Sequence, residues 1–285
     1  MSTRRIEVRP LSGALGAEIH GVDLARLDDE AFAEIRRAWL EHLVVFFREQ
    51  EITPAQQVAF ARRFGEIHYH PYMRGLDEQP EILEIVKNPG ESYTFGSEWH
   101  TDQMFNPRPA MATMLYAKET PNAGGDTLYA NMYLAYEALS KGMKAMLAGL
   151  KTYNLGNRSK RRFGGAARAD RYANNPSMLA KLKEPVDQPT ESTHPLVRTH
   201  PETGRKALYI GSHTHSLEGF REQEADPIID FLRAHAAKPE FTCRFRWRPG
   251  SLAVWDNRCA QHHAVADYDE RRSMHRITIA GDEPF

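Results

Sequence analysis

The segment SEWHTDQMF, residues 97–105, places a histidine and an aspartate two positions apart. In a strand, residues i and i+2 point to the same face, so on a strand or at its end the imidazole of His100 and the carboxylate of Asp102 would aim at one point. Far along the chain, the segment CAQHHAV adds His262 and His263. Two histidines and one carboxylate can occupy one face of an iron(II) ion and leave three positions open for a chelating cosubstrate and dioxygen. We therefore expect a metal site made by His100, Asp102 and one of the two later histidines.

A cluster of arginines follows the second pair of histidines, in the segment DERRSMHR. On a strand, Arg272 and Arg276 would share one face, and Arg271 would lie on the other. A planar guanidinium donates two parallel hydrogen bonds to a carboxylate, so this pair suits a dicarboxylate or another anion. The usual interpretation of such a cluster is a solvated basic strand. We favour the anion site because the apolar Met274 and Ile277 surround the charges.

The elements that must position these residues are mainly strands. Apolar alternation or short apolar runs, with turn residues between them, predict a β-sandwich or barrel with helices packed outside it. The predicted strands are 5–12, 16–23, 43–48, 81–88, 110–119, 126–131, 150–155, 194–200, 206–211, 241–249, 251–258 and 275–281. The predicted helices are 27–42, 52–67, 132–150 and 222–237.

Local signals set the ends of these helices. Asp28 or Asp29 can cap the first helix, while Thr53 suits the N-cap of the second and Gly65 its end. We expect the third helix to break near Gly142. Trp99, Phe105 and Tyr116 are interpreted as core residues. His194, His200, His213, His215 and His275 show no ligand spacing that competes with the metal site.

Length and composition predict one soluble domain over residues 1–285. No linker or repeat divides the chain, and 41% of its residues are hydrophobic. The 37 basic residues nearly balance the 38 acidic ones, which gives no reason to expect nucleic acid or an anionic membrane as a partner. The apolar run 43–47 is too short for a membrane span. Without a signal-peptide pattern, and with only two cysteines, we expect a cytoplasmic protein.

Residues 156–192 are rich in Arg, Lys, Asn, Gly and Pro, and they predict a long irregular loop. The first part of this loop carries a basic run that includes Arg161 and Arg162, followed by Phe163. A solvated charge run is the usual interpretation. The alternative is a lid that closes over an anionic substrate and excludes water, with Phe163 covering the pocket.

Several motifs occur in a fixed order: WHTD, GGDTLYANMYLAYEAL, HPLVRTHPETGRKALYIG, WDNRCAQHHAVADY and RRSMHRITIAGD. With them, the chain resembles the taurine dioxygenase and 2,4-dichlorophenoxyacetate dioxygenase family of iron(II)- and 2-oxoglutarate-dependent enzymes. The resemblance begins at GALGAEIHGVDL and runs to the last residues. It implies a mainly β, α+β protein with a double-stranded β-helix, the cupin-like jelly roll of clavaminate synthase-like proteins. It also implies a homo-oligomer, a dimer or a tetramer.

The same resemblance implies roles for individual residues. His100, Asp102 and His262 would bind Fe(II), and His262 is favoured over His263 by its position in the motif. Thr127 and Arg272 would hold the far carboxylate of 2-oxoglutarate, with Arg276 either assisting or lying nearer the acidic group of the substrate. The residues implied along the substrate pocket are His70, Gly96, Gln103, His213, Thr214 and Arg276.

The implied reaction consumes dioxygen and 2-oxoglutarate, hydroxylates a small anionic substrate, and releases succinate and carbon dioxide. A sulfonate, a sulfate ester or an aryloxy or alkyl carboxylate fits this expectation. Taurine itself is disfavoured because Gly96 replaces a family asparagine. Two alternatives stay open, a zinc hydrolase on the same three ligands and a jelly-roll binding protein without activity. The hydrolase would have no use for Thr127 and Arg272.

Overall fold

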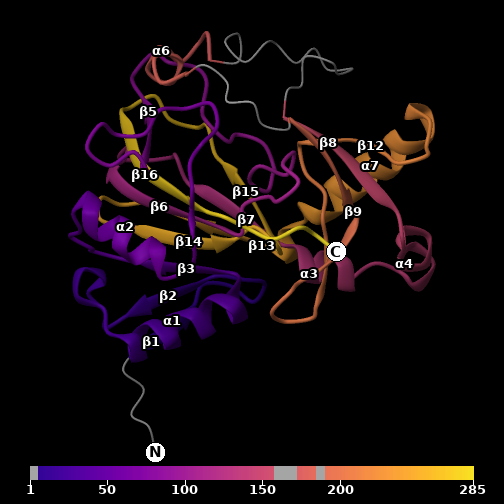
Figure 1. Ribbon diagram of the computed structural model, residues 1–285, viewed down its shortest axis with the longest axis horizontal. Coiled ribbons are helices and arrows are strands. Elements are labelled where there is room, and N and C mark those ends of the chain that lie inside the picture. The colour runs from indigo at the N-terminus through magenta and orange to yellow at the C-terminus, as the bar shows by residue number, and fades with distance from the viewer. Residues whose placement is uncertain (1–5, 157–171, 184–189) are drawn as a thin grey trace, which may run out of the picture.

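The large sheet of the protein is mostly antiparallel and carries the strand that holds both arginines of the anion site (Figure 1). The structure is a computed structural model, and it describes residues 6–156, 172–183 and 190–285. The strand order is β1 (Glu7–Pro10), β2 (Ala17–His20), β3 (Val44–Phe47), β14 (Leu252–Asp256), β6 (Ala112–Glu119), β16 (Arg272–Ile279) and β4 (Ile67–His68), and β5 (Leu83–Lys87) also pairs with β16. Only β2 and β3 are paired in parallel among the strands described.

Smaller antiparallel sheets make up the rest of the strand structure. They are β13 (Thr242–Phe245), β7 (Thr127–Asn131) and β15 (Ala260–Ala264); β12 (Thr214–Leu217), β8 (Lys151–Leu155) and β9 (Glu191–Pro195); and β10 (Val197–Thr199) with β11 (Lys206–Leu208). The first of them faces the large sheet. Phe46 of β3 stacks on Phe245 of β13 at 4.0 Å between ring centroids. Two facing sheets of this kind are the jelly roll that the sequence predicts.

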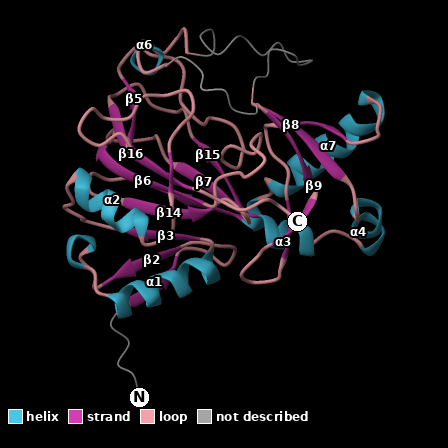
Figure 2. Ribbon diagram, viewed as in Figure 1, coloured by secondary structure: helices cyan, strands magenta, loops and turns pink. Residues whose placement is uncertain are grey.

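Helices cover the outside of the sheets, as Figure 2 shows. They are α1 (Asp29–His42), α2 (Pro54–Arg62), α3 (Met132–Glu137), α4 (Lys141–Leu147), α6 (Pro176–Leu179) and α7 (Glu222–Ala236), with short 3₁₀ turns at Leu24–Arg26 and Pro239–Phe241. Asp28 caps α1, and Thr53 forms a capping box at α2, as predicted. None of the described helices is long and apolar enough to cross a bilayer.

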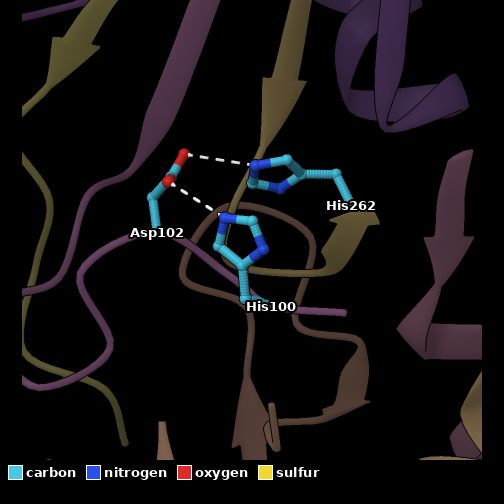
Figure 3. Close-up of side chains that lie close together, drawn as sticks. All are labelled: His100, Asp102 and His262. Atoms are coloured by element: carbon cyan, nitrogen blue, oxygen red, sulfur yellow. Dashed lines mark ion pairs between the residues drawn. The ribbon is translucent and has the colours of Figure 1, made fainter. Parts of the chain in front are cut away.

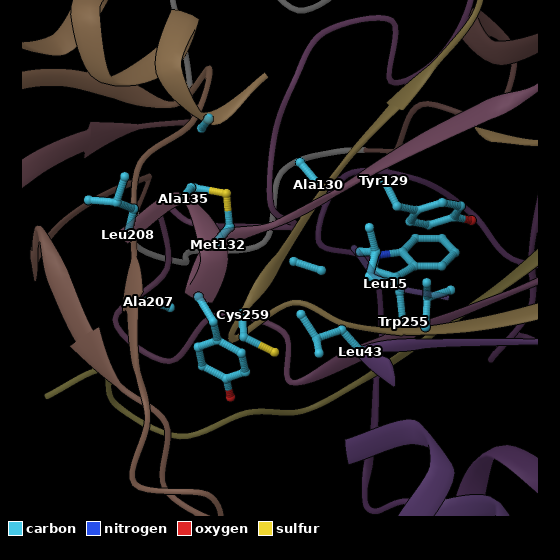
Figure 4. Packing of buried hydrophobic residues seen from close by; sticks show 14 of the residues in the cluster. Leu15, Leu43, Tyr129, Ala130, Met132, Ala135, Ala207, Leu208, Trp255 and Cys259 are labelled. Carbon is cyan, nitrogen blue, oxygen red and sulfur yellow. The ribbon is translucent and has the colours of Figure 1, made fainter. Parts of the chain in front are cut away.

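The large sheet is buried on both faces. One face packs on α1 and α2 through residues such as Trp39, Phe60 and Val254. The other face meets the smaller sheets in the cluster drawn in Figure 4. There the ring centroids of Tyr129 of β7 and Trp255 of β14 lie 5.7 Å apart. Because this second core fills the space between the sheets, the strands that carry the site residues are held rigidly.

Three predictions about elements need correction. The third helix breaks at Ala138–Ser140 rather than at Gly142, because the Ser140 side chain caps a new helix. Strand β12 was not predicted. Within 156–192, the described residues include α6 and the first two residues of β9 and are therefore not wholly irregular. The predicted lid residues, Arg161, Arg162 and Phe163, lie outside the described residues.

Candidate metal centre and its two cavities

Backbone pairing brings the two predicted histidine ligands together. The N–H of His100 donates to the carbonyl of His262 at 3.1 Å, and the N–H of His262 donates to the carbonyl of His100 at 2.9 Å. The two residues form an isolated antiparallel bridge at the edge of β15. Directly opposite residues in such a pair have side chains on the same face. The two imidazoles therefore lie side by side, with ring centroids 4.1 Å apart (Figure 3).

Asp102 completes the group from the turn that directly follows this bridge, where the sequence predicted a strand or its end. Its backbone N–H donates to Asn257 Oδ1 at 3.2 Å, and the hydroxyl of Thr113 donates to its Oδ2 at 2.6 Å. The carboxylate then lies 3.7 Å from His100 Nε2 and 3.8 Å from His262 Nε2 (Figure 3). The three donor atoms all lie within 4.8 Å of one another. The turn thus achieves the convergence that was expected from strand periodicity.

The protonation of the three groups suits a divalent cation. His100 Nδ1 lies 2.6 Å from the carbonyl oxygen of Glu98, so Nδ1 carries the proton. The lone pair of Nε2 therefore faces the side on which Asp102 lies, where a metal ion could bind both groups. Burial holds the pKa of His262 well below its usual value, which keeps this imidazole neutral. Burial alone would raise the pKa of Asp102, but the charge of Arg276, the two neighbouring imidazoles and the hydrogen bond from Thr113 together outweigh burial and hold that pKa low. Two neutral imidazoles and one carboxylate form a donor set for iron(II) or zinc.

Gly96 packs directly against one of these rings. Its φ of +81° lies in the left-handed region, and a Cβ at this position would come within 3.2 Å of His100 Cε1. A residue with a side chain would therefore meet both backbone strain and the imidazole. Gly96, which was predicted to line the substrate pocket, does line the larger of the two cavities described below. Its lack of a side chain also leaves room for the His100 ring.

The two arginines of β16 point into the same region but have different surroundings. Arg276 Nη2 lies 2.6 Å from Asp102 Oδ1, so its charge is already matched. Arg272 is 5% exposed, and its Nε and Nη2 atoms have no hydrogen-bond partner among the described residues. A buried guanidinium with unpaired N–H groups is costly unless an anion binds to it. The environment of Arg272 therefore calls for an anionic ligand.

A small cavity of about 40 Å³ lies at this place. Arg272, Thr127 and His262 all line it, together with Asp102 and Arg276. The Thr127 hydroxyl accepts a hydrogen bond from Trp247 Nε1 at 2.9 Å, which fixes its position. The cavity thus joins the unpaired guanidinium to the metal-binding group, as a chelating dicarboxylate would require.

A larger cavity of about 210 Å³ opens on the other side of the same group. The predicted residues His70, Gly96, Gln103, His213 and Arg276 line it. Thr214, predicted with them, does not. The hydroxyl of Thr214 is turned inward, donating to Asn154 Oδ1 at 3.1 Å and accepting from the backbone N–H of Gly211 at 3.2 Å.

Aromatic residues that sequence reasoning missed form much of this larger cavity. Phe105, interpreted as a core residue, lines it, and so do Tyr72, Tyr93, Phe95 and Tyr172. The position of Phe105, close behind Asp102 in the sequence, was an available signal. No pattern in the sequence marks the others, because their segments meet only in the folded chain.

Two polar groups of the larger cavity are neutral donors. His70 Nδ1 accepts a hydrogen bond from the backbone N–H of Tyr72 at 3.2 Å, so Nε2 carries the proton. Burial and the charge of Arg276 lower the pKa of His70 to about 3, which keeps the ring uncharged near neutral pH. Gln103 Oε1 accepts from Asn106 Nδ2 at 3.0 Å, while Gln103 Nε2 has no partner in the described ranges.

A second group with metal-ligand chemistry, His200, Asp256 and Cys259, also converges. Sequence spacing gave no sign of it. Arg258 donates to both carboxylate oxygens of Asp256, at 2.8 and 2.7 Å, and His200 Nε2 lies 3.0 Å from the same carboxylate. Burial, with the charge of Asp256, raises the pKa of the Cys259 thiol well above its usual value. With its carboxylate paired and its thiol protonated, this group is a buried ion-pair network.

Comparison with known proteins agrees with this geometry. Residues 7–278 match the model of the family described as "Taurine catabolism dioxygenase TauD, TfdA family". The chain belongs to this family. An alkylsulfatase from Acinetobacter baylyi is 34% identical over 98% of this chain and 86% of its own length. An (S)-phenoxypropionate/alpha-ketoglutarate-dioxygenase from Sphingobium herbicidovorans is 32% identical, over 97% and 95%.

The fold agrees as well. The crystal structure of a taurine dioxygenase from Burkholderia xenovorans superimposes with a TM-score of 0.81 at 37% identity, covering 99% of this chain and 91% of that one. The predicted family and the jelly-roll fold are therefore confirmed. As a member of the TauD, TfdA family, the protein is a dioxygenase. Neither the zinc hydrolase nor the inactive binding protein gains support from these comparisons.

Proposed function

We propose that this dioxygenase uses Fe(II), 2-oxoglutarate and O2 to hydroxylate a small organic anion, with succinate and carbon dioxide as coproducts. One observation carries the proposal. The buried guanidinium of Arg272, with two of its nitrogens unpaired among the described residues, shares a cavity of about 40 Å³ with His262 and Asp102. A ligand that fills this cavity must be anionic at one end and able to bind a metal at the other, and 2-oxoglutarate has both properties.

In this proposal His100, Asp102 and His262 hold the iron, which supplies the oxidising chemistry when it is bound. The rest of the chain prepares the ligands. The Glu98 carbonyl sets the tautomer of His100, and the Thr113 hydroxyl orients Asp102. Such outer contacts commonly change metal affinity by about 10- to 100-fold when they are removed.

Arg272 and Thr127 would bind the far carboxylate of 2-oxoglutarate. Their side chains line the small cavity beside the apolar Ile85, Leu115 and Trp255. This apolar lining keeps water away from the carboxylate and strengthens each charge-assisted hydrogen bond. The contribution of Arg276 would be indirect. Its contact with Asp102 orients a metal ligand, and its side chain lines both cavities.

The larger cavity would hold the primary substrate. Its neutral donors His70 and Gln103 can hydrogen-bond an acidic group, and five Phe and Tyr rings form part of its wall. A sulfonate, a sulfate ester or an aryloxy or alkyl carboxylate meets these demands. The names of the relatives, an alkylsulfatase, a phenoxypropionate dioxygenase and a taurine dioxygenase, support this range.

A two-step experiment tests the proposal. Under anaerobic conditions, Fe(II) and 2-oxoglutarate together should give the purified protein a visible absorption band, and Arg272→Met should remove it at the same ligand concentration. In air, a panel of alkyl sulfates, alkanesulfonates and aryloxy acids should then stimulate succinate release, with products identified by mass spectrometry. A protein that hydrolyses a panel member with zinc and without 2-oxoglutarate would refute the proposal.

We further infer a cytoplasmic homo-oligomer, a dimer or a tetramer. The inference is supported by the family resemblance and by the two cysteines, Cys243 and Cys259, which are buried and unpaired. Light scattering coupled to size-exclusion chromatography gives the mass in solution, and a monomer at micromolar concentration would contradict the inference.

A further inference from the structure

Residues 172–183 contribute one wall of the larger cavity through Tyr172. This side chain is 5% exposed. Its ring stacks on Phe95 at 6.2 Å with an interplanar angle of 10°, and it meets Tyr93 edge-on at 5.3 Å and 90°. All three rings line the cavity. Residues from two separate segments thus form one continuous aromatic surface beside the metal-binding group.

Buried polar contacts attach the segment that carries Tyr172 to residues 86–93, which lie much earlier in the sequence. Asn175 is 1% exposed, and its Nδ2 donates to the carbonyls of Val86 and Tyr93 at 3.3 and 3.0 Å. Glu91 Oε1 accepts from the backbone N–H and the hydroxyl of Ser177, at 2.9 and 2.8 Å. Each contact satisfies a polar group that would otherwise be costly to bury. Asn175 therefore holds the segment in one position against Tyr93.

The other end of the same segment is fixed too. The N–H of Arg74 donates to the carbonyl of Lys181 at 2.8 Å, and the N–H of Lys183 donates to the carbonyl of Tyr72 at 3.1 Å. In Figure 1 the segment, marked by α6, lies beside the β5 end of the large sheet. Hydrogen bonds thus attach this segment to the chain near Tyr72 and near Tyr93, both of which line the cavity.

The size and lining of the cavity suit a single ring. Tyr72 and Phe105 form a second pair of contacting rings, at 6.5 Å, and Phe105 meets His213 at 5.1 Å. An engineered protein cavity of about 150 Å³ holds one benzene molecule. A cavity of about 210 Å³ therefore has room for one ring and a short acidic chain. His70 and Arg276 also line it and can bind the acidic group.

We propose that Tyr172, positioned by Asn175, is a specificity-determining residue that selects anions carrying one flat ring over alkyl anions of similar length. The proposal rests on the proposed function, because it concerns the substrate of the same site. Offset and edge-to-face ring contacts favour aromatic ligands beyond the area that they bury. A preference of about tenfold is the expected scale for the contribution of one such ring.

Binding tests the proposal without requiring turnover. The dissociation constants of phenoxyacetate and of a linear alkanesulfonate are measured by calorimetry on the anaerobic complex with Fe(II) and 2-oxoglutarate. Tyr172→Ala should weaken phenoxyacetate about tenfold and change the alkanesulfonate less than about threefold. Tyr172→Phe, which keeps the ring, should retain the wild-type preference. Asn175→Ala should weaken phenoxyacetate by a smaller factor, because the ring remains but is less firmly placed.

Controls separate this proposal from the general one. Tyr136→Ala removes a half-buried tyrosine from α3, away from the cavity lining, and should leave both constants unchanged. The anaerobic absorption band should persist in every variant, and its absence from the wild type would overturn both proposals. With the band present, the assignment of Tyr172 falls if the wild type does not prefer phenoxyacetate, or if Tyr172→Ala weakens the two anions equally or not at all.

Discussion

Replacing Arg272 by methionine should stabilise the ligand-free protein while it abolishes 2-oxoglutarate binding. The guanidinium is 5% exposed, and two of its nitrogens are unpaired within the described residues. Each unsatisfied buried group costs about 1–3 kcal/mol, so an apolar side chain of similar length should gain about 2 kcal/mol. At about 2 °C per kcal/mol for a chain of this size, the midpoint of thermal unfolding should rise by about 4 °C.

Bound 2-oxoglutarate should reverse the order of thermal stability of the wild type and the Arg272→Met variant. At a hundredfold excess over its dissociation constant, 2-oxoglutarate with the metal should stabilise the wild type by about 2.7 kcal/mol, or about 5 °C. With the metal present in both samples, the Arg272→Met variant should shift by no more than about 1 °C at the same 2-oxoglutarate concentration, because loss of a buried charge-assisted contact weakens binding by about 100-fold or more. Differential scanning calorimetry, with and without ligand, measures both effects.

The neighbouring residue provides a matched control for this experiment. Arg271 immediately precedes β16, is exposed, and pairs with Glu119 at 3.0 Å. Surface pairs contribute about 0–1 kcal/mol, so Arg271→Met should change the midpoint by at most about 2 °C and leave ligand stabilisation intact. If Arg272→Met instead destabilises the ligand-free protein and still responds to 2-oxoglutarate, the guanidinium is a structural group and the reasoning is wrong.

Three further predictions follow from packing and protonation. Gly96→Ala would place a Cβ within 3.2 Å of His100 Cε1 at a φ of +81°, so iron affinity, measured by competition with a chelator, should fall at least about tenfold; an unchanged affinity would show that the ring can yield. Gly156→Ala would place a Cβ 2.8 Å from the Phe105 ring and push that ring toward the larger cavity. Calorimetry should then show that ring-bearing anions bind about tenfold more weakly while 2-oxoglutarate binds as before; equal losses of affinity for both ligands would contradict this prediction. Burial lowers the pKa of His194 to about 4 from 6.5, so the unfolded state binds this proton first and the free energy of unfolding falls as pH drops from about 6.5 to 4. His194→Gln should reduce this loss by up to about 3 kcal/mol, as measured by urea unfolding at each pH. If the free energies of unfolding of the variant and the wild type depend on pH in the same way, the assignment to His194 is wrong.

Elements with local signals were predictable from the sequence. The caps of α1 and α2 were identified at Asp28 and Thr53, because a cap is a contact between residues three positions apart. The break between α3 and α4 was placed too late. A glycine inside a helix is tolerated, whereas the side chain of Ser140 starts a new one.

The metal-binding group was predictable in composition but not in geometry. Residue spacing alone could not choose between His262 and His263, since that choice depends on the register of β15 against β7 and on the bridge to His100. The register turns the ring of His262 toward Asp102. The turn at Asp102, with a φ of +54° at Gln103, has no signal in the residues that form it.

The lining of the larger cavity was the least predictable part. Tyr172 and Phe95 are far apart in sequence and meet only because Asn175 and its neighbours attach one loop to another. Conversely, Thr214 appeared suitable for the cavity, but a hydrogen bond to Asn154 turns it inward. Side-chain direction in loops follows from tertiary contacts, which a single sequence does not reveal.

The reciprocal backbone bonds between His100 and His262 have a consequence for how the protein acquires its metal. Until the chain has been synthesised past His262 and β15 has joined its sheet, only two of the three ligands are available. High-affinity loading must therefore wait until β15 has paired, and an ion bound there stabilises the folded sheet rather than an earlier state without that strand.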